Sequence, residues 1–265
     1  MTSQLPTISS PSANRGELLG LFYSPYTERA RWALDHHEVP YKYSEYLMML
    51  GDPLLHWKAR SLKSNVTVPF FIHGTRRLGD SYAIAQYADQ IGTGSKLFSP
   101  NDLAAIDQWN RASEATLGAA RAVVVHRLRE NSEARLDHLP KLLPEPFNGA
   151  LRSAAGPIAN LAIRYLQKSF QIKDSTAEHL TELRKRFLAL RQALGGRPYL
   201  LEKFSYADIT SSVCVQALEP VEEPYLSLGS AAREAWRIGE LAREFSDLIE
   251  WRNSLYRKHR TRSAC

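Results

Sequence analysis

The stretch Leu18 to Arg29, LLGLFYSPYTER, decides the fold of the first part of this 265-residue chain. The residues 18–23 form a short apolar run that ends abruptly at Ser24-Pro25. From Glu28 to His37 the apolar residues then recur at helical spacing. The sequence therefore predicts a strand that leads directly into a helix, with Ser24 in the connection.

The next residues extend this unit in an ordered way. Val39 to Tyr46 alternates as a half-buried strand does, and Asp52-Pro53 is a helix start for a short helix to about Leu62. The later predicted elements are a strand over Val68 to Ile72 opened by proline, a return strand near Arg76 to Leu78, and a helix over Tyr82 to Ile91 after Asp80-Ser81. The order βαβ, helix, ββα is the thioredoxin-like arrangement.

From Asn101 the pattern becomes helical up to about Lys258. Predicted helices run from Asn101-Asp102 to about Arg129, over Leu151 to Gln171, over Thr176 to Leu194 and over Ile209 to Leu218, with one broken or two short helices over Ala231 to Tyr256. A capping box, Ser205 to Asp208, opens the fourth of them. We thus expect a flexible N-terminal extension (1–16), a thioredoxin-like domain (17–92), an all-helical domain (101–258) and a basic tail (259–265).

The positive charge of the chain raises the question of whether it binds nucleic acid. The net charge is +6, and the excess lies in scattered helix faces and in the tail that contains Arg257, Lys258, His259, Arg260 and Arg262. We expect such a tail to be solvated rather than to bind nucleic acid, because no stripe of basic and aromatic residues accompanies it.

Two further features indicate the compartment. No stretch is long and apolar enough to span a membrane, and the first residues have no apolar core of a secretory signal. The two cysteines, Cys214 and Cys265, lie far apart, which suits a reducing cytoplasm. We therefore expect a cytoplasmic protein with no membrane partner.

Four local patterns in one order narrow the family. They are Ser24 to Arg29 (SPYTER) after the first strand, Val68-Pro69 opening the third, Asp80-Ser81 at the next helix start, and the capping box at Ser205. Together they resemble the cytosolic glutathione S-transferase superfamily over roughly residues 17 to 258. The resemblance implies an α/β thioredoxin-like domain that holds glutathione and an all-α domain that shapes a second-substrate pocket.

The SPYT segment resembles the serine-type transferases, and this resemblance makes Ser24 the catalytic candidate. Its hydroxyl would hydrogen-bond to the glutathione sulfur, and the N-terminus of the following helix would add to the stabilisation of the thiolate. The alternative is that Ser24 only caps that helix. Tyr23 is the rival activator, since tyrosine-type transferases resemble this segment one position earlier. Neighbouring strand residues point to opposite faces, so we expect only one of the two to serve.

The remaining glutathione contacts follow from the resemblance. Pro69 stands where the family has a cis-proline, so that the backbone of Val68 would bind the cysteinyl part, and Asp80 with Ser81 would bind the γ-glutamyl end. Thr67 occupies a position where the family often has Lys or Gln, which leaves the contact to the glycyl carboxylate open. Lys63, His56 and Lys58 are the alternatives for it.

The other candidate residues point to no separate site. His36-His37, His126 and His138 lack companions at metal-ligand spacing, so no metal is expected, and Cys214 lies in an apolar helix pattern typical of a core residue. Serine at position 24 and threonine at 27 stand where glutaredoxins have the cysteines of CPYC. Serine cannot form a mixed disulfide, which disfavours thiol-disulfide exchange.

The expected function is glutathione transfer to an electrophilic, hydrophobic small molecule, as in detoxification. The alternatives are a non-catalytic transferase-like binding protein and a glutathione-dependent reductase or isomerase on the same site. The resemblance also implies a homodimer, in which the glutathione end of one subunit lies near the helical domain of the other.

Overall fold

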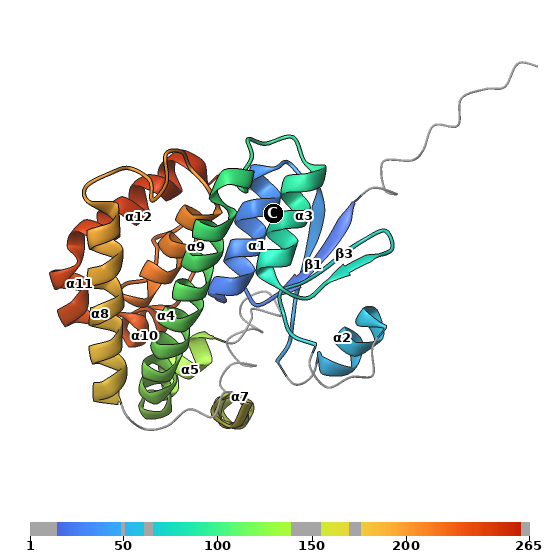
Figure 1. Cartoon of the computed structure of the whole chain (residues 1–265). Helices are drawn as coiled ribbons and strands as arrows, with labels where there is room; N and C mark the ends of the chain where they lie inside the picture. The colour runs from blue at the N-terminus through green and yellow to red at the C-terminus, as the bar shows by residue number, and fades with distance from the viewer. Residues whose placement is uncertain (1–14, 49–50, 61–65, 139–154, 170–175, 261–265) are drawn as a thin grey trace, which may run out of the picture.

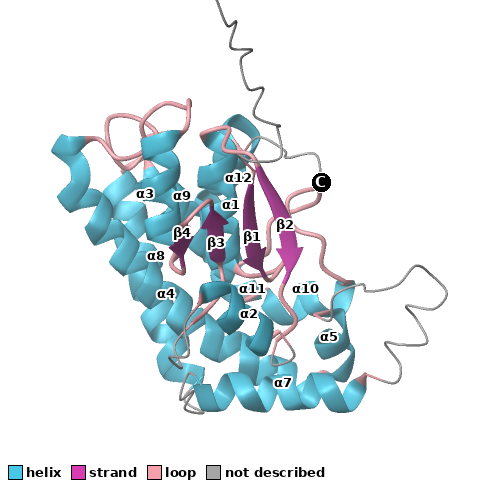
Figure 2. Cartoon of the chain, turned by 90° about the vertical axis from the view of Figure 1, so that its right-hand side faces the viewer, coloured by secondary structure: helices cyan, strands magenta, loops and turns pink. Residues whose placement is uncertain are grey.

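The computed structural model describes residues 15–48, 51–60, 66–138, 155–169 and 176–260. Their first part contains a sheet of four strands in the order β2-β1-β3-β4. The strands are β1 (Gly16–Gly20), β2 (Tyr41–Glu45), β3 (Phe70–His73) and β4 (Arg76–Leu78). β1 pairs parallel with β2 and antiparallel with β3, and β4 returns antiparallel on β3. This is the predicted thioredoxin-like topology (Figure 2).

Three helices complete this domain: α1 (Pro25–His36), α2 (Asp52–Ala59) and α3 (Ser81–Ile91). α1 and α3 lie side by side between the sheet and the helical domain (Figure 1). Leu18, Leu34, Phe71 and Ile84 are completely buried between these helices and the sheet. These side chains form the core of the first domain.

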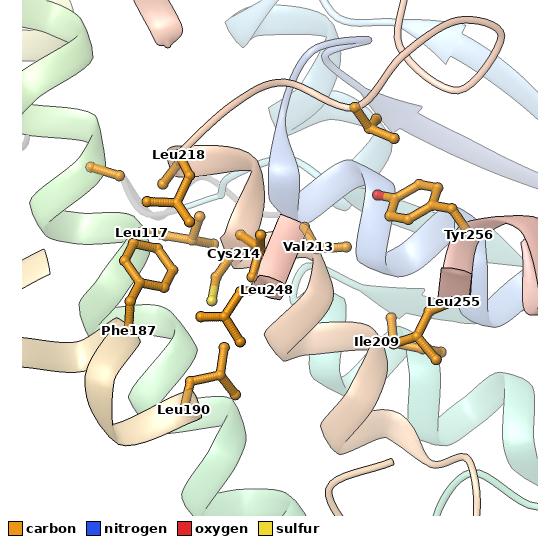
Figure 3. Close-up of a cluster of buried hydrophobic side chains, with 14 of the residues drawn as sticks. Leu117, Phe187, Leu190, Ile209, Val213, Cys214, Leu218, Leu248, Leu255 and Tyr256 are labelled. Carbon is orange, nitrogen blue, oxygen red and sulfur yellow. The ribbon is translucent and has the colours of Figure 1, made fainter. Parts of the chain in front are cut away.

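The second part is helical throughout the described residues. It contains α4 (Leu103–Glu130), α5 (Ser132–Asp137), α7 (Gly156–Ser169), α8 (Thr176–Leu194), α9 (Tyr206–Cys214), α10 (Ser230–Trp236), α11 (Gly239–Glu244) and α12 (Ser246–His259). A 3₁₀ turn, Pro100–Asp102, precedes α4, and another, Val215–Ala217, follows α9. Every residue of α9 is buried, so this helix forms the centre of the domain. Around it pack side chains from α4, α8 and α12, including Leu117, Phe187, Leu248 and Tyr256 (Figure 3).

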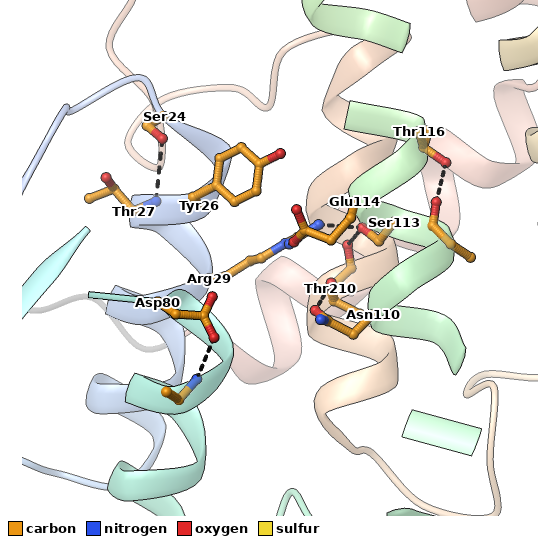
Figure 4. Close-up of polar contacts among 12 residues, drawn as sticks. Ser24, Tyr26, Thr27, Arg29, Asp80, Asn110, Ser113, Glu114, Thr116 and Thr210 are labelled. Carbon is orange, nitrogen blue, oxygen red and sulfur yellow. Dashed lines mark hydrogen bonds and ion pairs between the residues drawn. The ribbon is translucent and has the colours of Figure 1, made fainter. Parts of the chain in front are cut away.

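Polar contacts join the two domains along α1. The guanidinium of Arg29, fully buried, donates to Glu114 and to the hydroxyl of Ser113 on α4 (Figure 4). At the other end of the chain, Arg260 donates to Glu28 and Asp35 of α1. The helical domain therefore binds α1 at two places, through α4 and through Arg260.

The structure corrects several expectations about element ends. β1 ends at Gly20 rather than at Tyr23, because the chain turns at residues 22–23. Thr27 packs closely on Gly20, where an added Cβ would lie 2.4 Å from the Thr27 side chain. α2 ends at Ala59, where Arg60 adopts a left-handed conformation with φ 52°. The short helix α5 was not expected at all, because its pattern is only six residues long.

The largest difference concerns the C-terminal helices. Residues 231–256 contain three helices rather than one broken or two short ones. The chain breaks at Ile238, whose N–H donates to the carbonyl of Leu218, and at Phe245, which is fully buried in the core. Tertiary packing thus interrupts a pattern that local periodicity alone would continue.

The basic tail is also corrected in part. Arg260 is buried against α1, because two carboxylates there compensate its charge, and it is not solvated as expected. Residues 1–14 and 261–265, the prolines at 140, 144 and 146, and Lys63 lie outside the described residues. No helix within the described ranges is long and apolar enough to cross a membrane.

Candidate functional site

A cavity of about 400 Å³ lies between the two domains. The first domain contributes the loop after β1 and the chain just before β3, and the second contributes faces of α4, α5, α7 and α10. Its helical wall is mainly aliphatic. That wall contains Leu117, Ala120, Val124, Val125, Leu128, Ile158, Ala159, Ala162, Ile163 and Leu166.

Ser24 lies at the N-terminus of α1 and borders this cavity. Its Oγ accepts a hydrogen bond from the N–H of Thr27 at 3.5 Å, so Ser24 is the N-cap of the helix (Figure 4). Pro25 at the first helical position loses no hydrogen bond there. Because Oγ accepts in the cap, the hydroxyl proton remains for another acceptor.

Tyr23 borders the same cavity. β1 ends at Gly20, so Tyr23 and Ser24 both follow the strand, and the alternation of neighbouring strand residues does not apply to them. The Tyr23 ring lies edge-on against His138, with ring centroids 5.0 Å apart, and 6.4 Å from Trp236. Burial and the carboxylate of Glu45 raise the pKa of Tyr23 above its usual range.

The chain before β3 contributes another part of the cavity wall. Thr67 and Val68 line the cavity, and the peptide bond between Val68 and Pro69 is cis. Two segments that are far apart in the sequence, 23–26 and 66–68, are thus brought to one cavity. Pro69 itself is buried and does not belong to the lining.

Asp80 and Ser81 lie outside the cavity lining. Asp80 is exposed and caps α3, since its Oδ2 accepts from the N–H of Ala83 at 3.1 Å. Ser81 is only 2% exposed, and its hydroxyl lies against the buried hydroxyl of Tyr206. The pair therefore forms a separate polar position at the start of α3, beyond the edge of the cavity.

The alternatives for the glycyl contact differ in their surroundings. The ammonium of Lys58 forms an ion pair with Glu17 of β1, and the Nδ1 of His56 bonds to the carbonyl of Asp52 at 2.8 Å. Lys58 is therefore already engaged with a neighbouring strand.

His138 and Trp236 are cavity residues that the sequence did not indicate. The Nδ1–H of His138 donates to the carbonyl of Ala134, and its Nε2 accepts from the indole N–H of Trp236, both at 2.7 Å. Burial lowers the pKa of His138, and these bonds fix one neutral tautomer. His138 lies at the end of the unexpected helix α5, so no periodic pattern could have revealed it.

Tyr26 and Arg121 add polar groups to the cavity wall. Arg121 donates to the Tyr26 hydroxyl at 3.0 Å, and the guanidinium carbons of Arg29 and Arg121 lie 5.2 and 5.5 Å from the Tyr26 ring centroid. Burial is the main cause that raises the pKa of Tyr26. The Tyr26 ring therefore lies close to two cations, Arg29 of α1 and Arg121 of α4.

The described residues give little support for a metal site or a reactive cysteine. No group of three or more His, Cys, Asp or Glu residues there lies close enough to hold a metal ion. Cys214 is buried, and desolvation raises its thiol pKa to about 11, as expected for a core residue.

Comparison with known proteins agrees with this arrangement. Residues 18–96 match the family model of the glutathione S-transferase N-terminal domain. A probable glutathione S-transferase of Solanum tuberosum is 31% identical over 37% of this chain and 45% of its own, and one of Nicotiana tabacum is 32% identical over 44% and 50%. The matched part thus spans about half the length of these relatives.

A solved structure extends the likeness in fold to the helical domain. It is a glutathione S-transferase from Methylobacillus flagellatus with GSH bound, similar over 92% of this chain and 95% of its own, with a TM-score of 0.57 and 17% identity. Residues 18–96 are thus similar to the N-terminal domain of glutathione S-transferases, and the fold of the chain as a whole is similar to that of a solved glutathione S-transferase.

Proposed function

We propose that this chain is a glutathione transferase that activates the glutathione thiol for attack on an electrophilic, hydrophobic small molecule. One observation carries the proposal. A single cavity is bordered by Ser24, Thr67 and Val68 on one side and by the aliphatic wall of α4 and α7 on the other. A thiol bound at the first side would face an apolar second substrate across a continuous space.

The proposed role of Ser24 rests on the charge of the nucleophile. A free thiol with a pKa near 8.5 is only about 3% thiolate at pH 7, and the thiolate is the nucleophile. The Ser24 hydroxyl would donate a hydrogen bond to the sulfur, and the N-terminus of α1 would add a favourable field. The sulfur then forms a bond to the electrophilic carbon, and the leaving group departs with the electron pair, or a double bond accepts it.

We further propose how glutathione would lie across the first domain. Three extended residues span roughly 10 Å, so a tripeptide with its sulfur at Ser24 can reach beyond the cavity. The cis peptide at Val68-Pro69 would bind the cysteinyl backbone, while Asp80 and the start of α3 would bind the charged γ-glutamyl end. The position of Asp80 and Ser81 outside the cavity is compatible with this length.

Reduction by thiol-disulfide exchange is less well supported. The residues at the start of α1 are Ser24 and Thr27, and the described cysteine, Cys214, is buried in the helical domain. A mixed disulfide with glutathione would need an exposed thiolate near the sulfur. We therefore place conjugation before reduction and isomerisation.

The family resemblance also supports a cytoplasmic homodimer as a proposal, with neither nucleic acid nor a membrane as a partner. Exposed apolar side chains at Ile91 of α3 and Leu103 of α4 could lie in such an interface. Light scattering should give about twice the chain mass of 30.0 kDa at micromolar concentration. A mass near that of one chain would contradict the dimer.

Two experiments test the proposed activity. The purified chain should conjugate glutathione to a chloronitroaromatic electrophile, as followed by absorbance, and should bind glutathione in calorimetry. Asp80→Ala combined with Ser81→Ala should weaken glutathione binding at least tenfold, because the γ-glutamyl charges lose their partners. Unchanged affinity in that double variant would remove the assignment of this subsite, and binding without conjugation would favour a binding protein.

A further inference from the structure

A second, much smaller cavity also borders Ser24. Its volume is about 10 Å³, and it is separate from the large cavity. It is lined by Phe22, Tyr23, Ser24, Glu28, Gln216, Val221, Tyr225 and Leu226. Among the described residues, three border both cavities: Tyr23, Ser24 and Gln216. Gln216 is thus the residue of the helical domain that stands beside Ser24 at the boundary of the two spaces.

The side chain of Gln216 is held firmly in place. It lies in the 3₁₀ turn after α9 and is only 3% exposed. Its Nε2 donates to the hydroxyl of Tyr256, a fully buried residue of α12, at 2.7 Å. That bond uses one of the two amide N–H groups, and a second N–H and the carbonyl oxygen belong to the same rigid group.

The small cavity has the size and the lining of a water site. About 10–15 Å³ of probe volume is needed to hold one water molecule, which then requires two to four polar partners. Its lining residues include Ser24, Glu28 and Gln216, whose side chains carry groups that can bind a water molecule. Glu28 is fixed in turn by its ion pair with Arg260, at 2.8 Å.

We propose that Gln216 is a positioning residue that acts on Ser24 through one water molecule bound in the small cavity. The water donates one proton to Ser24 Oγ, and the amide of Gln216 with the carboxylate of Glu28 binds its other sites. Together with the N–H of Thr27, this water occupies both acceptor positions of the hydroxyl oxygen. The hydroxyl proton is then directed into the large cavity, toward the sulfur of bound glutathione. The inference rests on the proposed function and deepens it.

The test is a double-mutant cycle read by the thiol pKa of bound glutathione. Gln216→Met keeps the length of the side chain and removes both hydrogen-bonding groups. Thiolate absorbance against pH should show a thiol pKa raised by about half to one unit, less than in Ser24→Ala. Glutathione affinity should stay within about twofold, and turnover should fall about three- to tenfold at pH 6.5 and recover at pH 9. In a Ser24→Ala background, Gln216→Met should add nothing.

Tyr225→Phe is the matched control. Tyr225 lines the small cavity but not the large one, and its hydroxyl donates to the carbonyl of Tyr256 at 3.3 Å. Its replacement should leave the thiol pKa at the wild-type value. A shift as large as that of Gln216→Met would overturn the proposal, because it would mark a general disturbance of the packing.

The outcomes separate the inference from the proposed function. If Ser24→Ala raises the thiol pKa but Gln216→Met does not, or if the two effects add, the inference is overturned and the proposed function stands. If Ser24→Ala leaves the thiol pKa unchanged, both fail. A high-resolution crystal structure of the wild-type protein with glutathione provides a test that needs no variant. It should show one water within hydrogen-bond distance of Ser24 Oγ and Gln216, and a dry small cavity would overturn the proposal.

Discussion

Ser24 combines two roles that are often treated as alternatives. The structure shows it as the N-cap of α1, and the same side chain borders the large cavity. An N-cap oxygen accepts a hydrogen bond, whereas a thiolate needs a donor, so one hydroxyl can do both. The cap therefore holds the hydroxyl in place without using its proton.

Replacing Ser24 by alanine should change the pH dependence more than the affinity. In Ser24→Ala we expect the thiol pKa of bound glutathione to rise by about one to two units, which matches the loss of a charged hydrogen bond worth roughly 1.5–3 kcal/mol. Thiolate absorbance as a function of pH measures this shift. Glutathione affinity in calorimetry should change little, because most contacts lie elsewhere.

Tyr23→Phe provides the comparison, since Tyr23 borders the same cavity. Burial raises the pKa of the Tyr23 hydroxyl, so it remains protonated and is a possible rival donor to the sulfur. We expect Tyr23→Phe to keep the wild-type thiol pKa. If it instead loses thiol activation while Ser24→Ala keeps it, a tyrosine-type mechanism replaces the proposal.

The predictability of the site differs from residue to residue. Ser24 and Val68 could be predicted because each follows or opens a strand in a recognisable local pattern, and both border the cavity. His138, Trp236 and Gln216 could not: His138 follows a helix that no pattern indicated, and the helical patterns around Trp236 and Gln216 do not show that these side chains reach the cavity. Their place at the cavity results from the packing of the helical domain onto α1.

At the scale of single elements, the capping box at the start of α9 also contributes to the stability of the fold. The carboxylate of Asp208 accepts from the N–H of Leu200 at 2.8 Å and from the N–H of Ser205 at 2.9 Å, and it is fully buried. These bonds close the predicted capping box at the start of the central helix. The start of α9 was predictable from four residues for this reason.

Asp208→Ala should therefore destabilise the fold strongly. We expect the free energy of unfolding to fall by about 2–4 kcal/mol, because buried N–H groups lose a charged acceptor. Urea denaturation measures it. Asn131→Ala is the control, since Asn131 caps the short helix α5 from an exposed position and should cost only about 1 kcal/mol. Equal effects in both variants would contradict the role of burial.

The helices were not all equally predictable. The long helices α4 and α8 each follow a sustained pattern, and their predicted starts and ends lie within two residues of those observed. Residues 231–256 were misjudged, because Phe245 and Ile238 interrupt the helix to enter the core. Local periodicity predicts helical propensity, whereas such breaks depend on distant partners.

At the scale of the whole molecule, several titrating groups couple stability to pH. Burial lowers the pKa of His37 and of His259 to about 4 and also lowers that of His138. Between pH 6.5 and 4 these histidines are therefore protonated in the unfolded chain but still neutral in the folded one. The free energy of unfolding falls as the pH falls. Asp208 and Glu45 act in the opposite sense, because burial raises the pKa of Asp208 to about 6 and that of Glu45 above its usual value, so the folded state takes up these protons first.

We expect the three histidines to outweigh the two carboxyl groups, so that stability is lost on acidification. We expect unfolding free energy to decrease by on the order of 2–4 kcal/mol from pH 7 to pH 4.5, after allowance for the partial exposure of His259. Denaturant titrations at several pH values measure this. His259→Gln should make the decline shallower, and an unchanged slope would show that His259 does not contribute.

The last prediction concerns the attachment of the chain's far end to α1. Arg260 donates to Glu28 at 2.8 Å and to Asp35 at 2.5 Å, and all three side chains are nearly buried. Beside them, the indole N–H of Trp32 donates to the carbonyl of His259 at 3.1 Å. Because α1 carries Ser24 at its start, this contact ties the helical domain to the helix of the proposed catalytic group. A basic residue in a tail gives no local sign of such a partner.

Arg260→Met should cost about 3–5 kcal/mol of unfolding free energy, because it leaves two carboxylates buried without a cation. Arg111→Met is the control, since the exposed pair of Arg111 with Asp107 should contribute at most about 0.5 kcal/mol. Adding Glu28→Gln and Asp35→Asn to Arg260→Met should restore part of the loss, because the uncompensated charges are then removed. If Arg260→Met unfolds at the same denaturant concentration as the wild type, the ion pairs of Arg260 make no net contribution to the free energy of unfolding. The contacts of Arg29 with α4 would then have to hold the two domains together.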